Sequence, residues 1–292
     1  MELKKDVQSF WDAHPCGAKF TPQALGTPDF FKAVEEHRYR LEPHIAEFAA
    51  FSMAKGKRVL EIGCGIGTDG ARFTREGAYY IGLDLSPRSV LLAKKNFEGR
   101  NLSAGLLVSD AESLPFRDGA FDYVYSCGVL HHTPDIGKAV AEIHRALRPG
   151  GQAVVMLYHK RSWNYYLGIL FLRRLGALLL YSDGGVRLVH RLFGDNLEHL
   201  QQHARRLCAH GWRSLVGRAW LNNNTDGVGN PLSRVFTRKE VSGLFRQFSR
   251  VRTHVRFLHL EWLPLFRTFL VGAADRALGR VFGWHLYVLA EK

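Results

Sequence analysis

Residues 58–67 read RVLEIGCGIG, a short apolar run that passes directly into a turn with a glycine at every second position. Such a run, bounded by a turn, is typical of a buried strand. Without side chains at Gly63, Gly65 and Gly67, the backbone can approach a ligand closely at the carboxyl edge of a sheet. The stretch therefore predicts a strand followed by a nucleotide-type binding turn.

Short apolar runs alternate with amphipathic helical stretches downstream of this turn, the pattern of a parallel sheet with crossover helices. Strands are expected at 58–62, 79–85, 105–109, 121–126, 152–158, 250–258 and 285–290. Helices are expected at 69–76, 87–97, 135–147 and 237–248, with Arg148, Pro149, Gly150 and Gly151 ending the third of these. We expect an α/β fold with a doubly wound, seven-stranded, mostly parallel sheet.

The alternation of strands and helices predicts four parts of the chain. These are an N-terminal helical lid at 1–57, a core at 58–163, a helical insertion after the fifth strand at 164–233, and a core completion at 234–292 that includes an apolar segment at 260–282. The insertion contains YYLGILFLRRLGALLLY at 165–181, which is too short, and too interrupted by Arg173 and Arg174, to span a bilayer. It is expected to form a buried or interfacial helix.

Charge is divided unevenly between the two halves of the sequence. Residues 1–158 carry 19 basic and 19 acidic side chains, whereas residues 159–292 carry 21 and 8, which accounts for the whole net charge of +13. This asymmetry indicates an anionic partner, such as a phosphorylated or carboxylated substrate, an acidic membrane surface or nucleic acid. A solvated basic face is the alternative.

The cysteines Cys16, Cys64, Cys127 and Cys208 lie far apart without a CxxC pair, so neither a metal site nor a disulfide framework is predicted. The N-terminal stretch MELKKDVQSFWDAH lacks the apolar core of a signal peptide. A cytoplasmic location is expected.

The glycines alone do not identify the ligand. Gly65, Gly67 and Gly70 satisfy GxGxxG, and Asp84 follows Gly65 by 19 residues, much as a dinucleotide-binding protein requires. A glycine-rich turn without any ligand is a further alternative.

Five stretches in order, EIGCGIG (61–67), GLDLS (82–86), SDAESLPF (109–116), FDYVYSCGVLHH (121–132) and LRPGG (147–151), decide between these alternatives. Together they resemble the class I S-adenosylmethionine (SAM)-dependent methyltransferases, a Rossmann-like family. The sequence is most similar to the methyltransferase type 11 branch that includes the ubiquinone and menaquinone C-methyltransferases. The resemblance is close over residues 58–160, looser over the last helix and strands, and slight in the insertion.

The resemblance implies SAM as cofactor and S-adenosylhomocysteine as product. The cofactor-binding residues that it implies are Glu61, Gly63, Gly65, Gly67, Asp84, Leu85, Asp110, Ala111 and Cys127. The glycine loop would pass beneath the methionine part of SAM, and Glu61 would fix this loop in position. The Asp84 carboxylate would accept hydrogen bonds from both ribose hydroxyls.

Two further contacts to SAM follow from the same resemblance. The Asp110 carboxylate would accept a hydrogen bond from the adenine amino group, and Ala111 would offer its backbone amide beside it. The Cys127 carbonyl would face the ammonium group of the methionine part. Alternatively, Asp110 is a helix cap and Cys127 a small core residue.

Candidate catalytic residues follow the fourth and fifth strands. His131 and His132, together with Tyr158 and His159, are expected to rim one crevice, where a histidine could remove a proton from the acceptor. Alternatively, His132 packs against the next helix and His159 caps one.

The residues after the fourth strand exclude several acceptors. They read CGVL, whereas the family's exocyclic-amine enzymes carry an Asp/Asn-Pro-Pro-aromatic loop. The Pro-Cys pair of the 5-methylcytosine enzymes occurs here at Pro15 and Cys16, outside the core, and arsenic methylation would need convergent cysteines that the sequence does not obviously supply. Carbon, oxygen or secondary-amine methylation remains.

Two segments outside the strands are candidates for substrate contact. In the N-terminal segment, which in this family folds over the cofactor, Trp11, His14 and Tyr39 are candidates to touch substrate or SAM; packing is the alternative for Trp11. The polar loop NNNTDGVGNP at 222–231 is either an active-site element or a surface turn.

The preferred hypothesis is methyl transfer to carbon or oxygen of a small, hydrophobic, anionic acceptor, such as an isoprenoid, quinone-like or lipid-like molecule. The basic, apolar insertion would form the substrate pocket and rest on an anionic membrane at its inner face. An RNA methyltransferase that grips phosphates with its basic half is the second hypothesis, although no RNA-binding module is evident. The third is a non-catalytic nucleotide-binding protein.

Overall fold

The computed structural model describes residues 2–193, 197–258 and 277–292 of the chain. Contacts between residues group the chain into two compact units. The first, which we call the sheet unit, comprises residues 1–157, 238–254 and 287–292, and the second, the helical unit, comprises residues 158–237 and 255–286. The four-part division drawn from the sequence remains a prediction.

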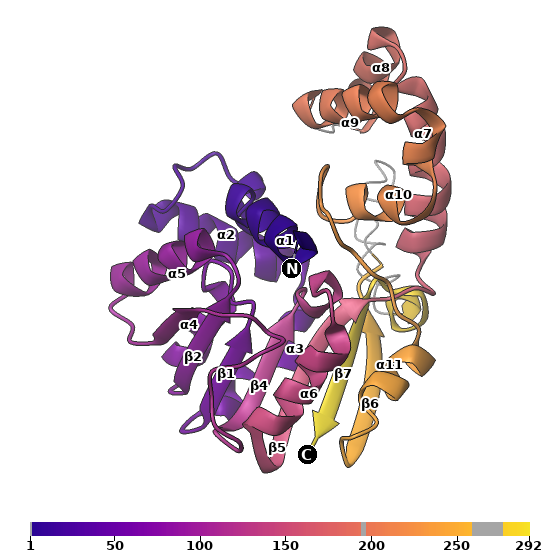
Figure 1. Cartoon of the computed structure of the whole chain (residues 1–292). Coiled ribbons are helices and arrows are strands. Elements are labelled where there is room, and N and C mark those ends of the chain that lie inside the picture. The colour runs from indigo at the N-terminus through magenta and orange to yellow at the C-terminus, as the bar shows by residue number, and fades with distance from the viewer. Residues whose placement is uncertain (1, 194–196, 259–276) are drawn as a thin grey trace. The chain divides into compact units, whose positions relative to one another are not determined.

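The sheet has seven strands, as predicted. They are β1 (Arg58–Ile62), β2 (Tyr79–Asp84), β3 (Gly105–Val108), β4 (Phe121–Cys127), β5 (Leu147–Tyr158), β6 (Arg250–Arg256) and β7 (His285–Glu291). Their order is β3-β2-β1-β4-β5-β7-β6. The pairs β1–β2, β1–β4, β2–β3 and β4–β5 are parallel, and β7 runs in the opposite direction (Figure 1). The doubly wound α/β fold is confirmed.

The apolar runs form central strands because both of their faces are covered. Val59 and Leu60 of β1 and Val124 and Tyr125 of β4 have no exposed surface. Strand order reverses between β1 and β4, since the chain builds β2 and β3 on one side of β1 and then returns to its other side. The carboxyl ends of β1 and β4 therefore border a switch point, where α/β sheets bind ligands.

Several helices of the sheet unit begin at a capping side chain. The helices of this unit are α1 (Glu2–Ala13), α2 (Pro28–Leu41), α3 (His44–Ala49), α4 (Thr68–Arg75), α5 (Pro87–Gly99), α6 (Ile136–Ala146) and α11 (Arg238–Leu244). The side chains of Thr27, Ser86 and Asp135 cap α2, α5 and α6 by accepting backbone N–H groups. Proline opens α2 and α5 at its preferred helical position.

The helical unit contains a π-helix (Asn164–Leu172), α7 (Arg173–Leu179), α8 (Asp183–Phe193), α9 (Leu197–His210) and α10 (Gly217–Asn223). The single helix expected at 165–181 is thus a π-helix that continues as α7. Most of the apolar segment predicted at 260–282 lies outside the described residues. Within the described ranges, no helix is long and apolar enough to cross a membrane.

Strand β5 begins five residues earlier than the predicted start at residue 152, at Leu147. The strand extends further because Lys292, which follows β7, pairs with the glycines at 150 and 151, where the sequence predicts a turn. Lys292 accepts from the Gly150 N–H at 2.9 Å and donates to the Gly151 carbonyl at 3.0 Å. This long-range pairing extends the strand through residues that locally favour a turn.

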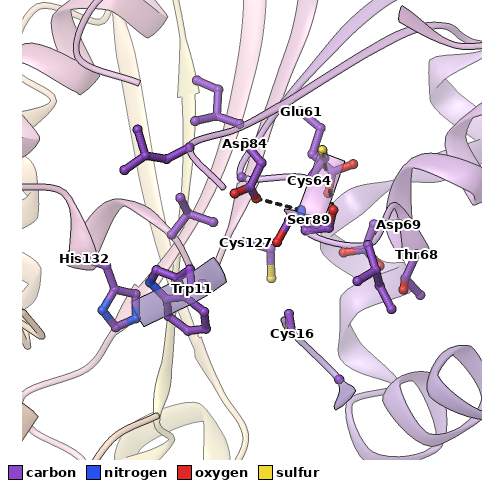
Figure 2. A pocket seen from close by; sticks show the side chains of 18 of the residues that line it. Trp11, Cys16, Glu61, Cys64, Thr68, Asp69, Asp84, Ser89, Cys127 and His132 are labelled. Carbon is purple, nitrogen blue, oxygen red and sulfur yellow. Dashed lines mark hydrogen bonds between the residues drawn. The ribbon is translucent and has the colours of Figure 1, made fainter. Parts of the chain in front are cut away.

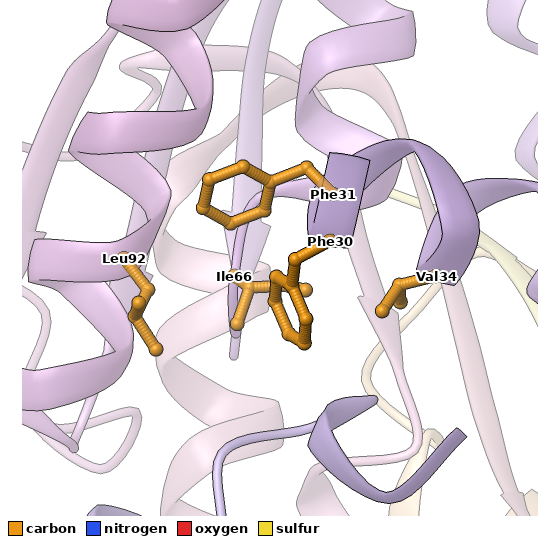
Figure 3. Packing of buried hydrophobic residues seen from close by; sticks show 5 residues of the cluster. All are labelled: Phe30, Phe31, Val34, Ile66 and Leu92. Carbon is orange, nitrogen blue, oxygen red and sulfur yellow. The ribbon is translucent and has the colours of Figure 1, made fainter. Parts of the chain in front are cut away.

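Helix α2 packs directly on the glycine turn that follows β1. Phe30, Phe31 and Val34 of α2 form a buried cluster with Ile66 of that turn and Leu92 of α5 (Figure 3). Phe30 is 1% exposed. Helix α2 therefore shares a buried core with the turn and holds it in place.

Replacing Phe30 with alanine should lower the free energy of unfolding by about 3–5 kcal/mol, because a buried ring is lost and a cavity remains. Urea unfolding measures the change. The control is Lys32→Ala on the same helix, whose side chain is 74% exposed and whose loss should cost about 0.5 kcal/mol or less. Equal effects of the two changes would contradict the packing described.

Candidate functional site

A pocket of about 190 Å³ lies at the carboxyl ends of β1, β2, β3 and β4 in the sheet unit (Figure 2). Of the nine residues expected to bind the cofactor, eight line it: Glu61, Gly63, Gly65, Asp84, Leu85, Asp110, Ala111 and Cys127. They come from four strand ends that are distant in sequence. The parallel arrangement brings them to one edge of the sheet.

The three glycines of the turn have different roles. All have positive φ, at 75° for Gly63, 52° for Gly65 and 78° for Gly67, a conformation that favours glycine. A Cβ on Gly63 would lie 2.2 Å from Val129, and one on Gly67 would lie 2.9 Å from Phe97 of α5. Gly67 does not line the pocket, so its missing side chain serves helix packing instead.

Gly65 is the glycine of this turn that leaves room for a ligand. The nearest atom to a Cβ placed on it is the Cys16 Cβ at 3.6 Å. Its amide donates to the Asp84 carboxylate at 2.9 Å, and the Ser86 amide donates to the other oxygen at 2.9 Å. Burial raises the pKa of Asp84, although the two amides oppose this effect. Asp84 thus ties the end of β2 to the turn after β1.

Glu61 lies beneath the glycine turn with 4% of its surface exposed. The Tyr80 hydroxyl donates to its carboxylate at 2.5 Å. Burial, followed by the nearby charge of Asp69, raises the pKa of Glu61 well above its usual value. Glu61, Asp69 and Asp84 therefore place three carboxyl groups at the floor of the pocket, and burial favours the protonated form of Glu61.

Helix α1 is tied to the strand ends by side chains spaced one turn apart. Lys4 forms ion pairs with Asp110 and Glu112 after β3, and the Gln8 amide donates to the Leu85 carbonyl at 3.0 Å. Residues four apart share one face of a helix. This face therefore lies along the loops that follow β2 and β3.

Asp12 continues the same helix face by one more turn. Its carboxylate accepts from the Ser86 hydroxyl at 2.5 Å and from the Arg88 amide at 3.2 Å. Val7 and Trp11 of α1 line the pocket. The N-terminal helix thus covers the pocket and is hydrogen-bonded along its length.

Two of the predicted catalytic histidines lie together after β4. The rings of His131 and His132 are 4.3 Å apart between centroids, in a 3-10 turn (Leu130–His132). His132 lines the pocket and meets the Trp11 ring edge-on at 5.2 Å, whereas His131 is fully buried and is not part of the lining. Trp11 and His132 form one wall of the pocket.

Tyr158 and His159 belong to the helical unit and have partners there. The Tyr158 hydroxyl donates to Asp226 at 2.6 Å. His159 Nδ1 lies 3.0 Å from the Gly283 carbonyl, and because a carbonyl can only accept, Nδ1 carries the proton. Their placement with the two histidines in one crevice remains a prediction.

The loop predicted at 222–231 is internally hydrogen-bonded. The Asn222 amide donates to the Pro231 carbonyl at 2.7 Å, and the Thr225 hydroxyl donates to Ser233 at 2.9 Å. Asn230 is 3% exposed. The loop is therefore a built element of the helical unit rather than a plain surface turn, and its role in a site remains a prediction.

Three cysteines converge on the pocket, although the sequence did not obviously supply such a group. Cys16, Cys64 and Cys127 all line it. Burial raises the pKa of Cys127 to about 12 and that of Cys64 well above its usual value, so both remain thiols at neutral pH. Among the described residues, no group of three potential ligands is arranged to hold a metal ion.

Sequence reasoning missed a charged pair at the β4 end of the pocket. Asp69 of α4 is 3% exposed and accepts from Arg38 Nη2 at 2.7 Å and Nε at 3.1 Å. The hydroxyls of Tyr39 and Tyr125 donate to the same carboxylate at 2.9 and 3.1 Å. The position of Asp69, just after the glycine turn and in a buried helix, could have indicated a functional carboxylate. No local sequence pattern distinguishes Arg38 from the other arginines.

Residues 60–155 match a family model described as a methyltransferase domain. The chain is 31% identical over 172 residues to an uncharacterized methyltransferase of Synechocystis, covering 53% of this chain and 79% of the relative. It is 39% identical over 103 residues to a demethylmenaquinone methyltransferase of Thermus thermophilus, covering 34% and 46% of the two chains. With a phthiotriol/phenolphthiotriol dimycocerosates methyltransferase of Mycobacterium leprae, 98 residues are 40% identical, covering 33% and 36%. The chain thus spans less than half of the last two relatives.

Solved structures share the fold. A protein of Pyrococcus horikoshii has a TM-score of 0.53 at 16% identity, covering 97% of this chain and 98% of its own. A SAM-dependent methyltransferase of Aquifex aeolicus has a TM-score of 0.50 at 14% identity, covering 91% and 98%.

Replacing Glu61 with glutamine should stabilise the protein increasingly as pH rises above about 4.5. Because the pKa of Glu61 is raised by folding, the folded protein binds more protons than the unfolded chain between the two pKa values, so the stability contributed by this group falls as pH rises. The difference should grow by about 1.4 kcal/mol for each pH unit in that window. Urea unfolding of both proteins from pH 4.5 to 8 measures it.

The control for this titration is Gln23→Ala, a change at an exposed side chain that does not titrate. Its stability difference should stay constant over the same range. If the difference in unfolding free energy between Glu61→Gln and the wild type also stays constant with pH, Glu61 has the same pKa in the folded and unfolded states, which contradicts the prediction.

Proposed function

Because the chain belongs to the SAM-dependent methyltransferase family, its methyl donor is SAM, and we propose that it transfers the methyl group of SAM to a carbon or oxygen atom of a small acceptor. This acceptor is hydrophobic and carries a negative charge. The observation that carries this proposal is the contrast between two parts of one pocket. Its floor holds the carboxyl groups of Glu61 and Asp69, which are buried, and of Asp84, which is half-buried, whereas Trp11 and His132 form an aromatic wall. The floor suits a cationic cofactor, and the wall suits an apolar acceptor.

The residues at the pocket floor fit SAM. Each Asp84 oxygen accepts one backbone amide and keeps a lone pair for a ribose hydroxyl. Gly65 leaves space above the turn for the methionine part, which Gly63 and Glu61 would support from below. The methyl group of SAM is attached to a positively charged sulfonium, and this charge would favour the ionised forms of Glu61 and Asp84 that burial alone disfavours.

The remaining contacts follow from strand order. Asp110 and Ala111, after β3, would bind the adenine amino group and ring edge, with Leu85 beside them. The Cys127 carbonyl, at the end of β4, would accept from the methionine ammonium. In this arrangement the Lys4–Asp110 ion pair links the covering helix to adenine recognition.

His132 is the candidate to handle the acceptor's proton. It lines the pocket against Trp11, whereas His131 is packed behind it. A hydroxyl or an acidic carbon becomes a better nucleophile when a nearby base removes its proton. SAM supplies a reactive methyl group, so the protein chiefly aligns the acceptor and excludes water.

The helical unit supports a lipid-like, anionic acceptor. Residues 158–237 carry 11 basic and 4 acidic side chains. Leu167, Phe171, Leu175 and Leu178 follow each other at helical spacing, and each is at least 43% exposed. Apolar surface and positive charge in one unit suit peripheral contact with an anionic membrane. Relatives named for demethylmenaquinone, sterol and phthiotriol substrates agree with this class of acceptor.

The same charge would also suit RNA phosphates. A relative named tRNA U34 carboxymethyltransferase is 38% identical over 119 residues, covering 35% of its length. RNA methylation is therefore the outcome against which the preferred acceptor is tested.

Asp84→Ala should weaken binding of SAM and S-adenosylhomocysteine by 10-fold or more, because the ribose loses a charged acceptor and the glycine turn loses its tie. Isothermal titration calorimetry measures both ligands, with NADH as a control that should not bind the wild type. Binding of NADH alone would contradict the proposed cofactor. Asp118→Ala, whose side chain is 80% exposed, is the matched control.

His132→Ala should lower kcat by about 10²- to 10⁴-fold while SAM affinity changes less than about 3-fold, since general-base assistance is lost and the cofactor contacts remain. The assay follows radiolabelled methyl transfer to isoprenoid phenols and quinols with and without a carboxylate, and to tRNA. His190→Ala, exposed on α8, should match the wild type. Transfer to tRNA with none to the phenols or quinols would replace the proposed acceptor.

A further inference from the structure

The seven-stranded sheet ends in two edge strands that differ in charge. Strand β6 forms one edge and β3 forms the other. Within its seven residues, β6 carries Arg250, Arg252 and Arg256, and the first two are exposed. Residues 101–109, which include β3, contain no charged side chain. Charged side chains on an edge strand oppose pairing with another chain, so β6 is protected in this way and β3 is not.

Exposed apolar side chains lie around the β3 edge. Val108 at the end of β3 is 49% exposed, and Leu91 of α5, the helix that packs against β3, is 56% exposed. On the neighbouring strand β2, Tyr79 is 71% exposed and lines a groove of about 720 Å³ together with Gly105 of β3. Apolar surface gathered in this way marks an interaction site more often than a free surface.

The backbone of β3 is available on one side. Its residues pair with β2 from Ile81↔Gly105 to Asp84↔Val108, and no strand of the described residues pairs with its other side. Because β3 has four residues, its backbone groups alone offer a small contact. The flanking apolar side chains would have to supply the rest of the binding energy.

Charges near this edge are of both signs. Helix α5 exposes two lysines and a glutamate, Lys94, Lys95 and Glu98. The groove is also lined by Arg58 and Arg117, and Arg58 is ion-paired with Asp122 at 3.0 Å. A partner with one strong sign of charge therefore gains little here, in contrast to the arginine-rich β6 edge.

A second copy of this chain is the partner that the β3 edge fits. Residues 1–158 carry 19 basic and 19 acidic side chains, so two copies that meet at β3 bring no net charge together from this part. The β6 arginines are six strand spacings away, about 29 Å, which exceeds the screening length of about 8 Å at physiological salt. Two copies that met at β6 would instead place arginine opposite arginine.

We infer that β3 pairs with the β3 strand of a second copy, antiparallel about a two-fold axis. Such a contact uses the same surface on both chains, so it closes at a dimer instead of growing into a filament. The backbone hydrogen bonds join the two sheets into one. Val108 and Leu91 of each copy lie at the contact and lose exposed apolar surface to the other copy.

Sedimentation velocity of the full chain tests whether the dimer exists. Over protein concentrations of about 1 to 100 μM, the wild type should show an equilibrium between monomer and dimer, without larger species. A monomer throughout this range would overturn the inference, and so would a series of growing oligomers.

Hydrogen exchange followed by mass spectrometry locates the contact. The backbone amides of residues 105–108 should exchange about 10-fold or more slowly at the concentration where the dimer predominates than where the monomer does, because pairing protects them. Exchange over residues 250–256 at the β6 edge should be the same at both concentrations. A dimer that leaves exchange at 105–108 unchanged uses another surface and would overturn the inference.

Val108→Lys supplies the charge that the β3 edge lacks. It should weaken dimerisation by about 10-fold or more, because two like charges are brought together and an apolar contact is lost. Since Val108 is exposed in the monomer, thermal unfolding of the variant should match that of the monomeric wild type. Ser242→Lys, at an exposed position on α11, adds the same charge elsewhere and should dimerise as the wild type does. Unchanged dimerisation of Val108→Lys would contradict the assigned edge.

Discussion

The pocket depends on a buried carboxylate that joins three parts of the chain. Asp69 lies in the first turn of α4, directly after the glycine turn, and accepts from Arg38 and Tyr39 of α2 and from Tyr125 of β4. A carboxylate with 3% exposure is stable only when its charge and lone pairs are satisfied. The N-terminal helices satisfy them, so the turn and its cover form one structure.

Acidic residues gather in the pocket where a cofactor is expected. Burial raises the pKa values of Glu61 and Asp84, which shows that their ionised forms are disfavoured in the protein alone. A ligand that carries positive charge into the pocket would relieve that cost. The protein in this way gives up some stability at a position where a cationic ligand restores it.

The fold was largely predictable because its signals are local. Apolar runs and caps placed β1, β2, β3 and β4 within one residue of their observed ends, and parallel strands brought eight of the nine expected cofactor residues to one edge. The Arg38–Asp69 pair was not predictable, because its members are 31 residues apart and meet only through the packing of α2. Strand β5 began early for the same kind of reason, since Lys292 pairs with Gly150 and Gly151.

Helix α1 also sets how the pocket can exchange its contents. Its Lys4, Gln8 and Asp12 hold three successive turns against the loops after β2 and β3, while Val7 and Trp11 line the pocket beneath. A ligand beneath this helix leaves when these bonds break, and a helix docked along its length tends to release as a unit rather than one residue at a time. Release of α1 as a unit would therefore set the residence time of a ligand bound beneath it. Changes at Lys4, Gln8 or Asp12, which lie away from any reacting atom, would alter turnover through this release step.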